Sequence, residues 1–192
     1  MSKLKVGLLG GTFNPVHQGH LLIAEQALSQ LHLDRVDFLP DFVPPHVDHK
    51  DAIAAHHRVA MLQLAIQSNP FFQIELTEIK RQGKSYSYDT MCELRAQHPD
   101  VEYYFIIGGD MVAYLDKWYR IDDLVQMVKF VGVNRPGTNS SSTYPVVGIS
   151  VPEFAVSSSL IRHDLQRGND VRYLLPDSVL DYIKEHHLYG TR

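Results

Sequence analysis

A chain of 192 residues with 44% hydrophobic content can bury one substantial core, so we expect a single domain over residues 1–192. Its formal net charge of −4 excludes a general affinity for nucleic acid. Its one cysteine excludes an internal disulfide, and no apolar segment approaches the roughly 20 residues of a membrane span. These features predict a cytoplasmic protein with no nucleic-acid or membrane partner, in which a local group of donors binds any anion.

The N-terminal stretch predicts a phosphate-binding turn between a strand and a helix. Residues 5–9 form the apolar run of a buried parallel strand, and residues 21–31 carry apolar residues at helical spacing. The glycines at 10–11 let backbone amides approach a ligand, and the free amides at the start of the helix favour an anion. His17 and His20, three residues apart, can both direct imidazole N–H groups into one pocket.

Apolar runs and helical patterns alternate along the rest of the chain. The long polar segment over residues 41–55 predicts a loop that covers a site. Ser87 is expected to cap one helix, and Pro176 to precede another. The expected strands cover residues 5–9, 36–39, 71–76, 101–107, 129–133 and 146–149. The expected helices cover residues 21–31, 59–68, 88–97, 121–127, 157–166 and 177–185.

This alternation predicts an α/β fold: a Rossmann-like, doubly wound parallel sheet with helices on both faces. Ligands of such sheets bind outside the carboxyl ends of the strands. Three polar turns fall there, namely residues 10–20, residues 108–110 and Arg135. We therefore expect one ligand site at this edge of the sheet.

The serines at 157–159 predict a helix start, since serine is a favoured N-cap with or without a ligand. Arg162 lies about one turn into that helix and can project its guanidinium beside the exposed amides. Cap and guanidinium together suit phosphate oxygens, so this segment predicts a second phosphate-binding element.

Two motifs carry a resemblance to a known family. Residues 10–20 resemble the (T/H)xGH signature of the nucleotidyltransferases, and residues 157–162 resemble their second, serine-rich motif. Five shorter motifs follow the order found in the bacterial nicotinate-nucleotide adenylyltransferases, which the chain resembles over nearly its full length. They are Pro44-Pro45-His46, Ser85-Tyr86-Ser87, Gly109-Asp110, Trp118-Tyr119 and Arg135-Pro136-Gly137.

The resemblance implies transfer of AMP from ATP to nicotinate mononucleotide, giving deamido-NAD and pyrophosphate in NAD biosynthesis, with Mg²⁺ carried on the ATP. It implies catalytic roles for His17, His20 and Arg162 and no metal site in the chain itself. The implied ATP-binding residues are Gly10, Gly11, Thr12, Phe13, His17, His20, Gly108, Asp110, Arg135, Ser158, Ser159 and Arg162. The implied mononucleotide-binding residues are His46, Lys50, Ser85, Tyr86, Ser87, Asp110, Trp118 and Tyr119.

Within the mononucleotide set, Trp118 would stack on the nicotinate ring, and residues 85–87 with the Tyr119 amide would bind its carboxylate. The chain departs from the family pattern after His46, where Val47 stands in place of a basic residue. Lys50, three residues further on, is our candidate for the missing charge. Two milder departures are Asn14 in place of aspartate and Ser87 in place of threonine.

Other interpretations remain open at this stage. A transferase of the same superfamily could adenylylate phosphopantetheine or use CTP, and a non-enzymatic nucleotide sensor could retain the same cleft. Eleven histidines invite a metal site, although their spacing matches no familiar zinc pattern. The oligomeric state, homo-oligomer or monomer, and the preference between acid and amide mononucleotides are also open.

Overall fold

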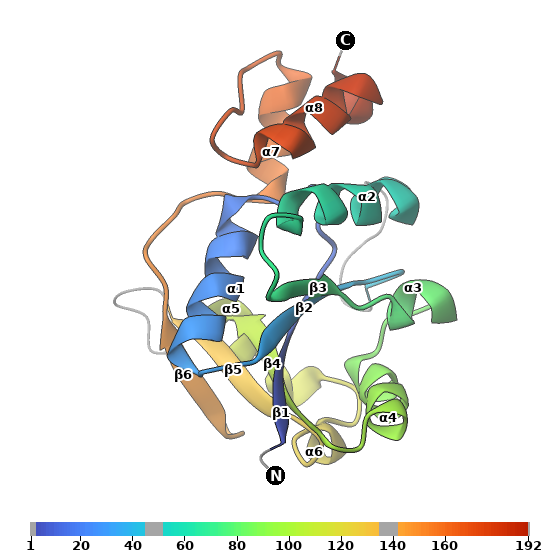
Figure 1. The fold of residues 1–192 in the computed structure, drawn as a ribbon, viewed down its shortest axis with the longest axis vertical. Coiled ribbons are helices and arrows are strands. Elements are labelled where there is room, and N and C mark those ends of the chain that lie inside the picture. Colours follow the sequence, from blue (N-terminus) through green and yellow to red (C-terminus); the bar gives the residue numbers. More distant parts are fainter. Residues whose placement is uncertain (1–2, 45–51, 135–141, 192) are drawn as a thin grey trace.

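The centre of the molecule is a six-stranded, fully parallel sheet in the order β3-β2-β1-β4-β5-β6 (Figure 1). The computed structural model describes residues 3–44, 52–134 and 142–191. The strands are β1 (Leu4–Gly11), β2 (Arg35–Pro40), β3 (Phe72–Ile74), β4 (Val101–Gly108), β5 (Lys129–Asn134) and β6 (Val146–Ser150). The chain winds outward from β1 to β3 and then returns to β4 beside β1, which confirms the predicted doubly wound α/β fold.

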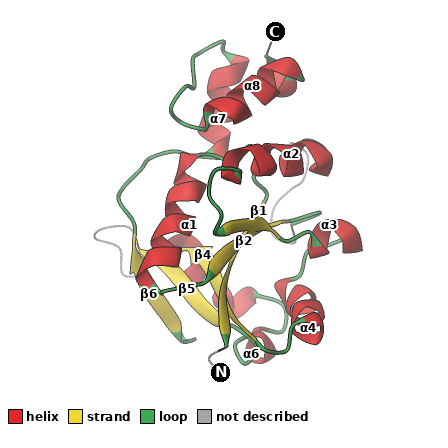
Figure 2. Cartoon of the chain, viewed as in Figure 1, coloured by secondary structure: helices red, strands yellow, loops and turns green. Residues whose placement is uncertain are grey.

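Helices cover both faces of this sheet (Figure 2). One face is covered by α1, α2, α7 and α8, and the other by α4, α5 and α6. The helices are α1 (Gln18–Gln30), α2 (Ala55–Ile66), α3 (Thr77–Arg81), α4 (Ser87–Gln97), α5 (Gly109–Val112), α6 (Ile121–Leu124), α7 (Ser158–Gln166) and α8 (Asp177–Glu185). The described residues also form two 3₁₀ turns, η1 (Leu115–Lys117) and η2 (Leu188–Gly190). None of the described helices has the length and apolar character needed to cross a membrane.

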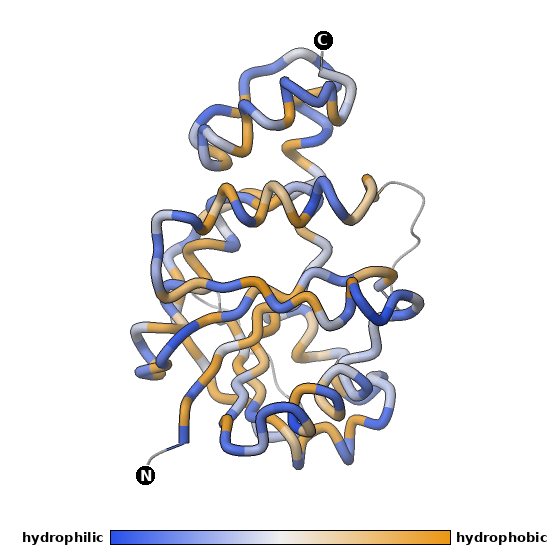
Figure 3. The backbone as a smooth tube through the Cα atoms, turned by 45° about the vertical axis from the view of Figure 1, so that its right-hand side comes forward, coloured by the Kyte–Doolittle hydropathy of each residue, from blue (hydrophilic) through white to orange (hydrophobic). Residues whose placement is uncertain are grey.

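Two hydrophobic cores result, one on each face of the sheet. In the central strand β4, Tyr103, Phe105 and Ile107 face one core, while Tyr104 and Ile106 face the other. Because β4 is buried on both faces, it reads as a continuous apolar run rather than an alternating one. Figure 3 shows the hydrophobic residues gathered along the central strands, with hydrophilic residues frequent on the outer helices and loops.

Most predicted elements are confirmed within a few residues, and three differ. The strand expected over residues 71–76 is shortened to β3, and the five-residue helix α3 that follows was not expected. The predicted cap at Ser87 is wrong. Tyr86 is the N-cap of α4, because its carbonyl accepts the amide of Thr90 and so makes the first helical bond, leaving Ser87 as the first helical residue.

Candidate active site

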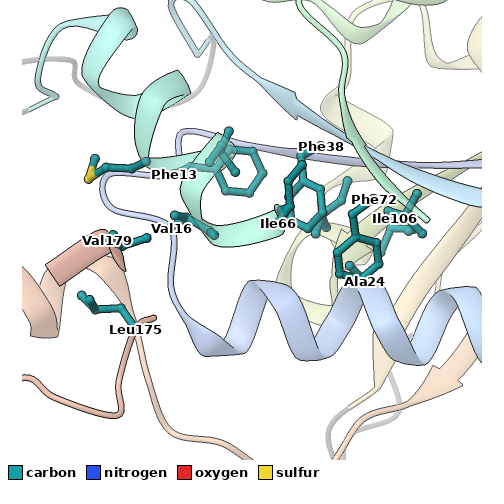
Figure 4. Close-up of a cluster of buried hydrophobic side chains, with 14 of the residues drawn as sticks. Phe13, Val16, Ala24, Phe38, Ile66, Phe72, Ile106, Leu175 and Val179 are labelled. Carbon is teal, nitrogen blue, oxygen red and sulfur yellow. The ribbon is translucent and has the colours of Figure 1, made fainter. Parts of the chain in front are cut away.

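The loop between β1 and α1 is anchored in the core by its own apolar side chains. Phe13 and Val16 are 2% and 0% exposed, and Figure 4 shows them among side chains from β2, α2 and the C-terminal segment. The Phe13 ring meets the Phe38 ring at 5.8 Å and the edge of the His20 ring at 5.0 Å. Because packing occupies the Phe13 ring, the predicted contact of Phe13 with a nucleotide would have to use its backbone atoms.

His17 and His20 stand side by side at the start of α1. Their rings stack with centroids 3.7 Å apart, and His20 Nδ1 accepts the backbone amide of His17 at 3.2 Å. That bond leaves the His20 ring proton on Nε2. Burial lowers the pKa of His17 to about 4 and moves the pKa of His20 well below its usual value. Both rings are thus neutral at physiological pH and can act as hydrogen-bond donors.

The two histidines line one cavity of about 180 Å³, whose opposite wall is the segment over residues 151–156. Gly19 makes this packing possible. A Cβ at Gly19 would lie 3.1 Å from the His17 ring and 3.0 Å from Val156 Cγ1, closer than most real Cβ contacts. Gly19, the second residue of α1, therefore lets the His17 ring and Val156 lie close to the helix backbone.

Helix α7 docks directly on the loop before His17. Its N-cap Ser157 accepts the amide of Leu160 at 3.2 Å, which confirms the predicted helix start. Ser158 donates to the Pro15 carbonyl at 2.8 Å, and Arg162 Nη1 donates to the Asn14 carbonyl at 2.9 Å. The structure thus joins the two predicted phosphate-binding segments through hydrogen bonds.

Arg162 has a second partner in α7, since its Nη2 donates to Ser159 Oγ at 3.3 Å. The side chain is half-buried and is not among the residues that line the histidine cavity. Its predicted contact with phosphate oxygens would therefore use the N–H groups that remain beyond these two bonds, or would replace the bond to Ser159.

A second cavity, of about 260 Å³, opens beside the same loop. It brings together four predicted segments: the glycine pair, the end of β4, the serine segment at the start of α4, and Trp118 with Tyr119. The glycine pair was predicted as a turn, but both glycines belong to β1 and pair with β2. Its lining includes Gly10, Gly11, Thr12, Gly108, Ser85, Tyr86, Ser87, Trp118 and Tyr119. Trp118 meets the edges of the Phe105 and Phe130 rings at 5.8 and 5.7 Å, so its indole is held at a fixed angle.

The serine segment is fixed from both sides. The Ser85 amide donates to the Val43 carbonyl at 2.8 Å, and Ser85 Oγ accepts the Phe42 amide at 2.9 Å. Ser85 also interacts with Glu78, a buried carboxyl in the cavity wall that accepts the Thr90 hydroxyl at 2.7 Å. Burial raises the pKa of Glu78. This carboxyl was not predicted, since one glutamate in a five-residue helix that also holds Lys80 and Arg81 gives no sequence signal of a site.

Comparison with known proteins now identifies the family. Residues 8–164 match the family described as "Cytidylyltransferase-like". The chain is 54% identical, over 98% of its length and 86% of the relative, to "Probable nicotinate-nucleotide adenylyltransferase" of Enterococcus faecalis. It is 56% identical to the protein of the same name from Lactiplantibacillus plantarum, over 96% of this chain and 88% of the relative. The chain belongs to the nicotinate-nucleotide adenylyltransferase family.

A solved structure supports the fold of this adenylyltransferase. It is described as "Plasmodium falciparum nicotinic acid mononucleotide adenylyltransferase complexed with NaAD", and it superposes with a TM-score of 0.80 over 98% of both chains. At 20% identity this likeness supports the fold alone. The family resemblance drawn from the sequence motifs is confirmed by the relatives named above.

A buried arginine, which sequence reasoning missed, holds the adenylyltransferase loop in shape. Arg58 of α2 is 2% exposed, donates to the carbonyls of Thr12 and Asp41 at 2.8 Å each, and lies 3.4 Å from Asp41 Oδ1. Thr12 Oγ1 in turn donates to Asp41 Oδ2 at 2.7 Å. The available signal was one basic residue within the apolar pattern of a helix, which a sequence alone does not distinguish from a surface charge.

The remaining predicted residues of the adenylyltransferase site are less constrained. Asp110 is exposed at the start of α5, and a Cβ at Gly108 would meet no atom within 4 Å, so this turn is open to a ligand. His46, Lys50 and Arg135 lie outside the described residues. Across residues 3–44, 52–134 and 142–191, no group of three or more His, Cys, Asp or Glu side chains is arranged to hold a metal ion.

Proposed function

We propose that this chain transfers AMP from ATP to nicotinate mononucleotide, giving nicotinate adenine dinucleotide and pyrophosphate in NAD biosynthesis. The single observation that carries the proposal is the position of the loop before α1, which borders both cavities. Gly10, Gly11 and Thr12 line one cavity, and His17 and His20 line the other. A phosphate chain along this loop would connect a nucleotide on one side with a mononucleotide on the other.

The larger cavity suits the mononucleotide. Trp118 offers a fixed aromatic surface to a pyridine ring. The Ser85 and Tyr86 amides already donate to the carbonyls of Val43 and Lys84, so the amides of Ser87 and Tyr119 would be the donors for its carboxylate. Asp110 would hold ribose hydroxyls from the open turn after β4. His46 and Lys50 stay predictions for the mononucleotide phosphate, because they lie outside the described residues.

The histidine cavity and the start of α7 suit the ATP phosphates. Neutral His17 and His20 supply donors without fixed charge. Ser158 and Arg162 contact the loop from α7, and the Ser159 hydroxyl lies beside the Arg162 guanidinium. Arg135 stays a prediction for the same nucleotide. Mg²⁺ would arrive with ATP, because phosphate oxygens are its preferred ligands, and would offset charge on the phosphate chain.

The chemistry that follows is direct in-line displacement. An oxygen of the mononucleotide phosphate forms a bond to the α-phosphorus of ATP while the bond to the bridging oxygen breaks and pyrophosphate leaves. His17, His20 and Arg162 would stabilise the charge that develops on the phosphate oxygens during this step. No residue of the proposed site needs to form a covalent intermediate, so positioning and electrostatics supply the catalysis.

One assay tests the proposal. The purified chain is incubated with ATP and Mg²⁺ and with nicotinate mononucleotide, nicotinamide mononucleotide or phosphopantetheine in turn, and pyrophosphate is measured. We expect release with nicotinate mononucleotide and a dinucleotide product of matching amount. Release with phosphopantetheine alone would favour the related transferase, and ATP binding without any release would favour a sensor. We also propose a cytoplasmic location, consistent with a lone cysteine.

A further inference from the structure

The last described turn of the chain reaches back to the loop before α1. Tyr189 of η2 donates its hydroxyl to Asn14 Oδ1 at 2.7 Å, across 175 residues of sequence. The Asn14 residue is 5% exposed, and burial raises the pKa of the Tyr189 phenol. The hydroxyl therefore stays protonated, and this side chain acts as a donor to the loop.

Asn14 lies where several elements meet. Its carbonyl accepts Arg162 Nη1 at 2.9 Å, and the next carbonyl, that of Pro15, accepts Ser158 at 2.8 Å. Its side chain accepts Tyr189 at 2.7 Å. One residue, three positions before His17, is thus fixed by α7 through its backbone and by η2 through its side chain.

The turn that carries Tyr189 is itself well supported. Helices α7 and α8 both pack against η2, and Leu188 and Tyr189 pack against the hydrophobic core on that face of the sheet. Thr191 Oγ1 lies within hydrogen-bond distance of two carbonyls, those of Leu188 at 2.9 Å and Ile183 at 3.2 Å. Because these contacts hold η2 in place, the Tyr189 hydroxyl occupies a defined position beside the loop.

We propose that Tyr189 is a positioning residue for AMP transfer. Its hydroxyl bonds to Asn14 and so holds the loop in the position from which Arg162 and His17 contact the phosphates. The inference rests on the proposed function. It adds to that function a residue from the C-terminal segment, far in sequence from both phosphate-binding motifs. Tyr189 itself is not among the residues that line the larger cavity.

The first test compares two tyrosine variants in the pyrophosphate assay. Tyr189→Phe should lower kcat by roughly five- to tenfold, the effect expected if the free energy of the one hydrogen bond to Asn14 is lost from the transition state, with KM for nicotinate mononucleotide within twofold. Tyr182→Phe is the matched control. It removes a comparable bond, 2.9 Å to His57 Nδ1, from the same C-terminal segment without touching the loop, and it should keep kcat.

Thermal unfolding of both variants separates positioning from stability. If Tyr189→Phe and Tyr182→Phe lower the melting temperature equally but only Tyr189→Phe lowers kcat, the positioning role of Tyr189 is supported. Unchanged kcat in Tyr189→Phe, or an equal fall in both variants, would overturn it. An inactive wild-type chain would instead defeat the proposed function.

A double-mutant cycle gives a second test. If Tyr189 acts through Asn14, the variant Asn14→Ala should lower kcat, and adding Tyr189→Phe to it should lower kcat by less than twofold more. Fully multiplicative effects of the two substitutions would show that Tyr189 does not work through Asn14 and would overturn the inference.

Discussion

The imidazole rings of His17 and His20 are stacked 3.7 Å apart and inclined by 25° at the start of α1. Two cationic rings could not occupy this buried position together without strong repulsion, and burial already disfavours the charged form of each. The folded protein therefore holds two neutral imidazole donors where anionic oxygens are proposed to bind. Protonation of these rings should consequently affect both its stability and its activity.

Acid should destabilise the free protein through these rings. Their folded pKa values are lowered, that of His17 to about 4, while in the unfolded chain both would titrate near 6.5. Above pH 6.5 neither state gains a proton, but below it the unfolded state binds protons that the folded state does not. The free energy of unfolding should thus fall by roughly 1.4 kcal/mol per pH unit for each ring.

Urea unfolding at pH 7.5, 6.0 and 5.0 measures this slope. The double variant His17→Gln/His20→Gln should flatten it. An equal slope in the double variant would assign the acid sensitivity to other groups.

Removal of either imidazole should affect turnover far more than folding. His17→Ala and His20→Ala each delete a donor proposed to stabilise charge on the phosphates, so kcat should fall by roughly 10²–10³-fold with both substrates saturating. Initial-rate measurements of pyrophosphate release check this. Near-normal turnover in either variant would remove that histidine from the mechanism.

Arg58 should be a major contributor to stability. Replacing it with Met leaves the Asp41 carboxyl beside a buried apolar side chain, although Thr12 still donates to it. We expect a loss of about 3–5 kcal/mol in the free energy of unfolding. Urea titration measures it, and the double variant Arg58→Met/Asp41→Asn should recover part of the loss because it removes the uncompensated charge. No recovery would show that the hydrogen bonds to backbone carbonyls dominate.

Trp118 should govern binding of the mononucleotide and not of ATP. Trp118→Ala removes the fixed ring of the larger cavity, so KM for nicotinate mononucleotide should rise by roughly tenfold or more while KM for ATP changes little. Tyr173→Ala is a suitable control, since that side chain is 79% exposed and outside this cavity. Parallel rises in both KM values would place Trp118 in a general structural role.

Local signals explain why so much of the fold could be predicted. Helix α8 begins directly after Pro176 and ends at Glu185, as expected, because proline marks the start and the apolar positions repeat at helical spacing. The histidines at 17 and 20 likewise marked the start of α1, whereas the two glycines predicted as a turn lie at the end of β1. The contacts of Arg58, Glu78 and Tyr189 could not be predicted in this way. Each depends on segments that only the folded sheet brings together.

The pairing of β1 with β4 places Leu9 opposite Ile106. A slip of one residue between these strands would exchange Phe105 with Ile106 between the two cores, so both helical layers oppose it. The glycines at the ends of the two strands, Gly10 and Gly11 in β1 and Gly108 in β4, consequently keep one relative position along the sheet. An insertion or deletion inside β4 would therefore displace Gly108 from Gly10 and Gly11, with which it lines one cavity.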